Sequence, residues 1–226
     1  MKKIKWLMIS LVLLFGVFAV SSAQTERQAE ARLEQWQKIE KAMREGLPKT
    51  ALAALKPVIM SALEDGAHAE AVLAIGQKVA LEGVIQGNKP EEKIVRFETE
   101  MEKAPDEIRP VMHAVLAHWY WQYFQQNRWR FMRRTATAEA PGDDITTWDL
   151  TRLFAEIDTQ FSIALESRDM LRSIPIQDYT ALLEKGTMPD SYRPTLYDFL
   201  AHRSVDHFTN ERSYLTQPAN RFLIKD

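Results

Sequence analysis

Residues 108–124 read IRPVMHAVLAHWYWQYF, and this stretch decides the fold. Apolar side chains recur in it every three to four residues, which places them along one side of an α-helix. The spacing predicts a helix that is capped by Asp106 and continues to about Arg134. We expect it to be the longest helix of the chain. Its apolar positions are Ile108, Val111, Met112, Val115, Leu116, Trp119 and Tyr123.

The same spacing recurs through most of the chain. Gly46 before Pro48, and Gly87 before Pro90, are expected to end one helix and start the next. Pro57 should bend the helix that contains it or mark a boundary. Thr146 or Thr147 is expected to cap a later helix, and further helices are expected near residues 176–183 and after Pro194. The apolar positions include Leu33, Trp36, Ile39, Met43, Leu52, Leu55, Val58, Ile59, Val72, Ile75, Val79, Ile94, Phe97, Trp148, Leu150, Leu153, Phe154, Ile157, Phe161, Leu165, Leu196, Tyr197, Phe199 and Leu200.

These patterns predict an all-α fold of stacked helical hairpins. The stacking is repeat-like and resembles that of tetratricopeptide proteins, although no repeat signature aligns at their period of about 34 residues. With only 8 glycines and 10 prolines, the composition does not favour a strand-and-turn protein. We expect a hairpin layer over residues 24–135, a linker over 136–145, a second helical layer over 146–210, and an extended tail over 211–226 that resembles the start of a further domain.

The first 23 residues have the features of a signal peptide. Three lysines precede an almost purely apolar run from Trp6 to Val20, and the small residues Ser21 to Ala23 provide a cleavage site. We therefore expect export to the periplasm or cell envelope, cleavage after Ala23, and membrane contact through this segment only. An uncleaved N-terminal anchor is the alternative. The apolar run is shorter than the ~20 residues that a membrane-spanning helix needs.

The composition argues against several classes of function. The chain has no cysteine, which excludes disulfides, thiolate metal sites and cysteine nucleophiles. Removal of residues 1–23 takes away three lysines and no acidic residue, so the net charge changes from −2 to −5, and nucleic acid is not an expected partner. Gly-rich phosphate loops, His-Glu-x-x-His motifs and Gly-x-Ser-x-Gly elbows are also absent from the sequence. We expect no catalytic residue, no metal site and no cofactor.

Three arrangements of His and Asp were considered as metal ligands. His113 and His118, like His202 and His207, are five residues apart, which is a poor spacing for shared ligation from one helix face. Asp198 and His202 are four apart and form a conceivable half-site, with an ordinary capping or surface pair as the alternative. Apart from these three, the acidic pair Asp143 and Asp144 is better explained by the start of a helix than by a calcium site.

An aromatic and basic segment over residues 119–134 is the candidate partner-binding surface. It could stack a sugar or single-stranded nucleic acid, or its arginines could hold an acidic partner. The alternative is that the aromatic residues are core and that the arginines form a solvated helix end. The candidate surface residues are Trp121, Arg128, Trp129, Arg130, Arg133 and Arg134.

Three segments together resemble a known family. Residues 120–131 (YWQYFQQNRWRF), 146–150 (TTWDL) and 193–203 (RPTLYDFLAHR), in this order, are similar to the N-terminal helical region of the very large bacterial alpha-2-macroglobulin-like proteins of the Bacteroidetes type. The turn at residues 46–52 (GLPKTAL) fits the same pattern, and the resemblance extends over about residues 35–222. It implies an exported protein that traps or inhibits proteases, in which this helical part precedes many β-sandwich domains.

The sequence also departs from that family. Because it has no cysteine, it cannot form the thioester of some members, and none of the matching positions belongs to the inhibitory machinery. We therefore expect a non-catalytic helical scaffold segment, either as a fragment or as a truncated member, with the remaining domains of a larger polypeptide, another protein or a protease as partner. A free-standing helical-repeat module that binds proteins is the alternative. An enzyme whose helical pocket holds strongly perturbed carboxylates is the third class.

Overall fold

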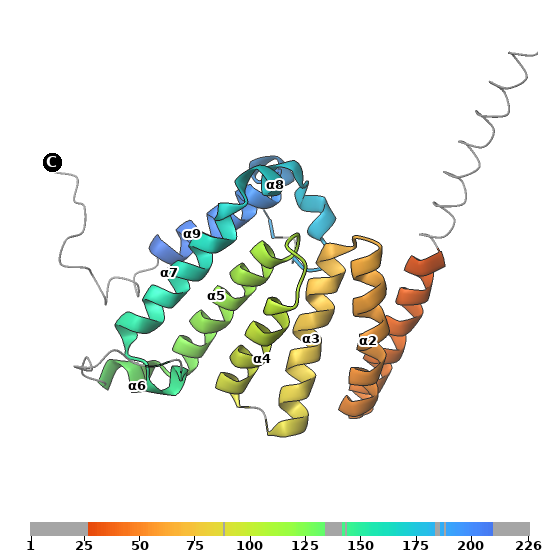
Figure 1. Ribbon diagram of the computed structural model, residues 1–226, viewed down its shortest axis with the longest axis horizontal. Coiled ribbons are helices and arrows are strands. Elements are labelled where there is room, and N and C mark those ends of the chain that lie inside the picture. The colour runs from red at the N-terminus through yellow and green to blue at the C-terminus, as the bar shows by residue number, and fades with distance from the viewer. Residues whose placement is uncertain are drawn as a thin grey trace, which may run out of the picture. The chain divides into compact units, whose positions relative to one another are not determined.

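The computed structural model describes residues 27–87, 89–133, 142, 144–183, 186–187 and 189–209. These residues form helices and loops and contain no strand, which confirms the all-α prediction (Figure 1). No helix among them is long and apolar enough to cross a membrane. The predicted signal peptide and the extended tail over 211–226 lie outside the described residues. Contacts divide the chain into two compact units, Met1–Ala67 and His68–Asp226.

The first unit contains a helical hairpin. A helix over residues 27–44 is followed by α2 (Pro48–Glu64), and Gly46 between them has φ of 70°, a left-handed conformation that glycine adopts without strain. The Arg32 side chain of the first helix is bonded to both Ser61 and Asp65 at the far end of α2. Pro57 lies inside α2 at an exposed position and does not end the helix, which continues to Glu64.

The second unit contains all the other described elements. They are α3 (His68–Gln86), α4 (Pro90–Glu102), α5 (Arg109–Gln126), α6 (Arg128–Arg133), α7 (Leu150–Glu166), α8 (Arg168–Ser173) and α9 (Leu196–Thr209), with 3₁₀ turns η1 (Ile145–Thr147), η2 (Ile176–Tyr179) and η3 (Asp190–Tyr192). Successive long helices pack against each other, α3 on α4, α4 on α5, α5 on α7 and α7 on α9 (Figure 1). This pairing agrees with the predicted stacking of helical hairpins.

An aromatic core lies around α5. Tyr120, Tyr123 and Phe124 are buried, and Phe131 of α6 is buried beside them. The rings of Tyr120 and Trp148 stack with centroids 5.6 Å apart. The interpretation of the aromatic segment as core is therefore confirmed for these residues. Their side chains bury large apolar areas, which supplies much of the driving force for packing α5 against α7.

The helix ends differ from the sequence prediction in two places. The helix expected to continue to Arg134 is interrupted at Asn127, whose amide nitrogen donates to the Tyr123 carbonyl oxygen at 3.0 Å, and α6 follows as a separate short helix. At 18 residues, α5 is also shorter than α3, which has 19. Ile108 takes the N-cap position of α5, and the predicted cap Asp106 pairs instead with Arg109 at 2.6 Å.

The predicted start of the next helix at Thr146 or Thr147 is also wrong, because α7 begins at Leu150. Asp149 caps α7, because its carboxylate accepts from the Arg152 N–H at 2.8 Å. Residues 145–147 form η1, which Asp144 caps through the Thr146 N–H at 2.9 Å. The predicted caps Thr146 and Thr147 are thus inside a 3₁₀ turn. Asp144 does mark the start of a helical turn, as expected, whereas Asp143 lies outside the described residues.

The predicted boundary at residues 136–145 differs from the boundary that the contacts give. The compact units meet at residues 67 and 68, and α5 and α7, which flank the predicted linker, have the most extensive contacts of any helix pair given for the second unit. Most of the predicted linker over residues 136–145 lies outside the described residues, and the division into two helical layers stays a prediction.

Candidate functional site

A cavity of the second unit lies between α5, α7, α9 and the segment that contains η2 and η3. Its volume is about 570 Å³, and it is partly open to solvent. A cavity of this size is typical of ligand sites and can hold a few side chains. It is lined by Val111, Ala114, Val115, His118, Phe161, Ile176, Gln177, Thr180, Leu182, Leu183, Gly186, Pro189, Asp190, Arg193, Phe199, Leu200 and Arg203.

One face of α5 forms a wall of the cavity. Val111, Ala114, Val115 and His118 are spaced by three and four residues, so they follow each other along the same side of the helix. The sequence had assigned Val111 and Val115 to the core stripe. In the structure Val111 is buried, but Val115 is only partly buried, because its side chain lines the partly open cavity.

The opposite wall comes from the chain after α8. The Ile176 N–H donates to the Pro194 carbonyl oxygen at 3.0 Å, and the Leu196 N–H donates to that of Ile174 at 2.9 Å. These two bonds form an isolated bridge between Pro175 and Thr195, which holds η2 beside the start of α9. The predicted helix near residues 176–183 is replaced by this short 3₁₀ turn, and α8 before it was not predicted.

His118 is a neutral hydrogen-bond donor toward the cavity. The Gln122 amide nitrogen lies 2.9 Å from His118 Nε2. An amide nitrogen only donates, so Nε2 accepts and the ring proton is on Nδ1. Burial lowers the pKa of His118, and the positive charges of Arg203 and Lys93 lower it further. The imidazole is therefore uncharged at neutral pH.

Two guanidinium groups give the cavity its charge. Arg193 follows η3 and is partly buried, whereas Arg203 lies on α9 with its side chain exposed. The Arg193 Nε is buried and has no acceptor in the part of the chain that the structure describes. The cavity's carboxylate, Asp190, accepts from the Gln177 amide nitrogen at 3.2 Å. The described lining thus carries two positive charges and one negative charge beside an apolar surface.

This arrangement is suited to recognition. Apolar side chains from three helices can exclude water from a bound ligand. The guanidinium N–H groups at the same cavity can hold an acidic group of that ligand in position. Sequence reasoning did not find this site. Arg193 was quoted only as part of a family pattern and Phe199 also as an apolar helix position, and the lining residues come from four separated segments that only the tertiary fold brings together.

The surface predicted from the aromatic and basic segment does not form as one patch. Trp121 points toward α7 and α9, where its ring centroid lies 5.1 Å from that of His207. Arg130 donates to the Tyr123 hydroxyl at 2.6 Å and covers the core. Trp129 is 67% exposed, and Arg128 and Arg133 are also exposed. Arg134 lies outside the described residues.

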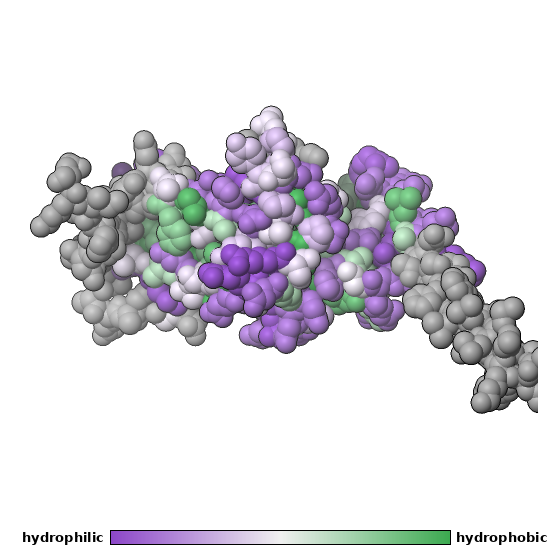
Figure 2. Space-filling model, turned by 90° about the horizontal axis from the view of Figure 1, so that it is seen from above, coloured by the Kyte–Doolittle hydropathy of each residue, from purple (hydrophilic) through white to green (hydrophobic). Residues whose placement is uncertain are grey.

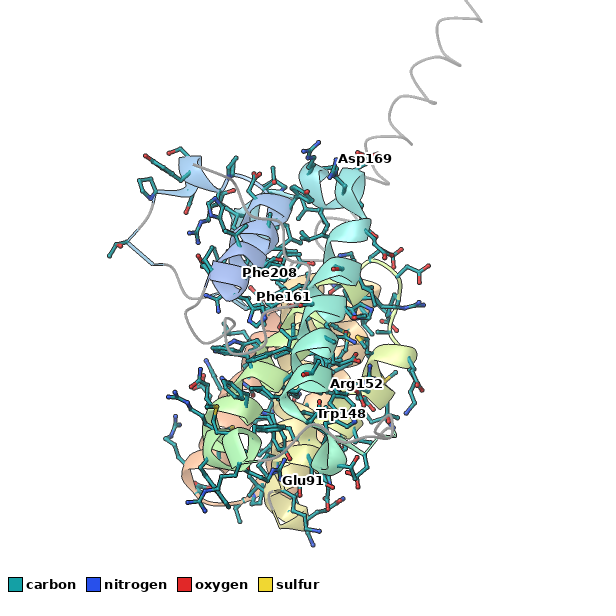
Figure 3. The ribbon with its side chains drawn as sticks, turned by 90° about the vertical axis from the view of Figure 1, so that its left-hand side faces the viewer. Glu91, Trp148, Arg152, Phe161, Asp169 and Phe208 are labelled. Carbon is teal, nitrogen blue, oxygen red and sulfur yellow. The ribbon has the colours of Figure 1, made fainter. Side chains whose placement is uncertain are left out.

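His207 is the centre of a buried aromatic cluster between α7 and α9. Its Nε2 lies 3.4 Å from Asp158 Oδ1, and the ring centroids of Phe161 and of the exposed Phe208 each lie 5.6 Å from that of His207. Figure 3 shows these two phenylalanines close together where α7 and α9 meet.

The surface in the view of Figure 2 is mostly hydrophilic, and its hydrophobic side chains occur in separate small patches.

Asp198, which with His202 was the predicted metal half-site, uses its carboxylate to cap α9. Asp198 Oδ2 accepts from the Thr195 hydroxyl at 2.7 Å and from the Thr195 N–H at 3.1 Å, and the Asp198 N–H donates back to that hydroxyl. This is a capping box at the start of α9, the ordinary alternative that the sequence allowed. Among the described residues, no group of three or more His, Asp or Glu is placed to hold a metal ion.

Comparisons with known proteins found no relative. No family model matches the chain, and no match was found among curated proteins or among solved structures. The resemblance to the alpha-2-macroglobulin-like proteins therefore rests on the quoted segments alone and stays a prediction.

Proposed function

We propose that this chain is a non-catalytic helical module that binds proteins, and that the cavity between α5, α7, η2 and α9 is its binding site. The proposal rests on one observation, the combination of an apolar cavity of about 570 Å³ with the Arg193 Nε, which is buried at its wall without a partner in the described chain. Burial of an apolar side chain of the partner would supply affinity, and the guanidinium groups would orient it.

The hydrogen bonds at the cavity favour binding over catalysis. His118 Nε2, which would be the basic nitrogen of this neutral ring, already accepts from Gln122. The Asp190 carboxylate accepts from Gln177. The guanidinium groups of Arg193 and Arg203 can only donate, and donors serve to bind an acidic or polar partner without performing a proton transfer.

Pools of fluorescent random hexapeptides test this function. We expect pools rich in apolar residues to bind the full chain, and we expect Thr180→Trp, at the cavity, to weaken that binding at least about tenfold by filling the space. Thr99→Trp is the matched control, because Thr99 is also exposed and also bonds its hydroxyl to a backbone carbonyl, but on α4 away from the cavity. If no pool binds, or if both variants lose binding equally, the cavity is not a binding site.

A scaffold role in a larger exported macroglobulin-like protein, with protease trapping as its family function, is the second candidate. The three matching segments favour it. An immunoblot of native cell fractions with an antibody to residues 30–210 tests it. A band far larger than 26.1 kDa would support the scaffold role, whereas a stable exported band near that mass would contradict it.

A further inference from the structure

The donors at the cavity define the chemistry of the ligand more closely. Arg193 Nε is buried without an acceptor, and a buried donor left unpaired is costly. Arg203 and the uncharged His118 line the same cavity and add N–H groups near Arg193. A ligand that brings acceptor oxygens to these groups removes that cost, so the structure favours a ligand with an acceptor-rich end.

The charge at the cavity favours an anionic ligand. Among the described lining residues, Asp190 is one negative charge beside the two positive charges of Arg193 and Arg203, and the neutral His118 adds none. Arg203 and His118 line the same cavity, and the positive charge of Arg203 contributes to the lowered pKa of His118. Arginine binds carboxylates through paired N–H groups in a planar fork, which gives strong and directional bonds.

The apolar lining restricts where that carboxylate can be attached. Val115, Leu183 and Phe199 line the same cavity as the guanidinium groups, so the ligand needs an apolar group close to its acidic group. The last residue of a polypeptide has both, because its α-carboxylate and its side chain share one Cα atom.

The polar pair at the cavity distinguishes a peptide from a simple aliphatic acid. Gln177 and Asp190 lie beside the cavity, where the Gln177 amide nitrogen donates to Asp190 Oδ2 at 3.2 Å. The backbone amides of a peptide can add hydrogen bonds to such a polar pair, whereas an aliphatic acid has no second polar group for it.

We propose that the cavity captures the carboxyl-terminal end of a protein, with the terminal carboxylate on Arg193 and Arg203 and an apolar last side chain against Val115 and Phe199. This inference rests on the proposed protein-binding function and names the part of the partner that the site recognises. Capture of a terminal carboxylate by converging donors is a general mode of peptide recognition.

The test compares hexapeptide pools that differ only at the carboxyl end. Pools ending in Leu, Phe or Asp are made as free acids and as amides, and binding to the full chain is measured by fluorescence anisotropy. We expect the free-acid Leu and Phe pools to bind at least about tenfold more tightly than their amides. Arg193→Ala and Arg203→Ala should remove this preference, Arg193→Lys should reduce it, and Arg128→Ala, at an exposed arginine outside the cavity, should preserve it.

The outcomes separate the two proposals. If free acids and amides bind equally, recognition of the carboxyl terminus is overturned and the protein-binding function stands. If amidated pools that end in Asp bind as tightly as the free-acid Leu pool, an internal acidic residue is the ligand and the inference also fails. Tighter binding of octanoate than of any free-acid pool would assign the cavity to an aliphatic acid, and binding of neither peptides nor octanoate would overturn both proposals.

Discussion

Two buried tyrosines show how one hydroxyl group changes a residue's contribution to stability. Tyr120 donates to Glu98 Oε1 at 2.5 Å, whereas the Tyr179 hydroxyl has no hydrogen-bond partner in the part of the chain that the structure describes. Burial raises the pKa of both, that of Tyr179 to about 12. The neighbouring Glu98 contributes to the increase for Tyr120 through its hydrogen bond, and the charge of Asp178 contributes for Tyr179.

We expect opposite results from the same substitution at these two positions. Tyr120→Phe should lower the free energy of unfolding by about 1–3 kcal/mol, because it removes a hydrogen bond to a charged group. Tyr179→Phe should leave it unchanged or raise it by up to about 1 kcal/mol, because it removes an unpaired buried hydroxyl. Urea unfolding at pH 7 measures both. A large loss for Tyr179→Phe would mean that the hydroxyl is satisfied.

His118 makes stability depend on pH in a defined direction. Its pKa in the folded chain is lowered by burial first and by Arg203 and Lys93 next. Below about pH 6.5 the unfolded chain therefore binds a proton at His118 that the folded chain does not bind, and stability falls as the pH decreases through this range. We expect His118→Gln to reduce the loss of stability between pH 7 and pH 5.5. An unchanged slope in urea titrations of the two proteins would contradict the assignment.

At the scale of the elements, local signals in the sequence predicted most helices but not all of their ends. Gly46 and Gly87 both have positive φ and end helices as expected, because this conformation has a low cost only for glycine. Asn127 was missed because its amide competes with the helix for a backbone carbonyl, and nothing in the apolar spacing signals this. The cap Asp149 was missed because three polar candidates precede α7 within four residues.

The capping box of α9 gives a prediction that separates a structural role from a metal site. Asp198→Ala removes the acceptor of the Thr195 N–H and hydroxyl, and we expect it to lower the free energy of unfolding by about 1 kcal/mol. His202→Ala, at an exposed position, should have almost no effect. Adding zinc or a chelator should not change the melting temperature of any of these proteins. A zinc-dependent increase that both substitutions abolish would restore the half-site.

At the scale of the whole molecule, the fold class could be predicted from sequence and the site could not. Helical periodicity is a local property, and it identified the stripes on α2, α5, α7 and α9. The cavity depends on how the chain after α8 returns to α5, which is set by the bridge between Pro175 and Thr195 and by packing between distant segments. The aromatic segment attracted attention because it is compositionally unusual, but most of its rings are core.

The central claim is that a protein end binds in the cavity of the second unit, and methyl NMR of the full chain tests it most directly. With Ile, Leu and Val methyl groups labelled, the free-acid Leu-terminated hexapeptide pool should shift the signals of Val111, Val115, Leu182, Leu183 and Leu200, which line the cavity. Signals of Leu33 and Val84, which are exposed and do not line it, should stay in place. Shifts at these exposed methyl groups with none at the cavity would contradict the account.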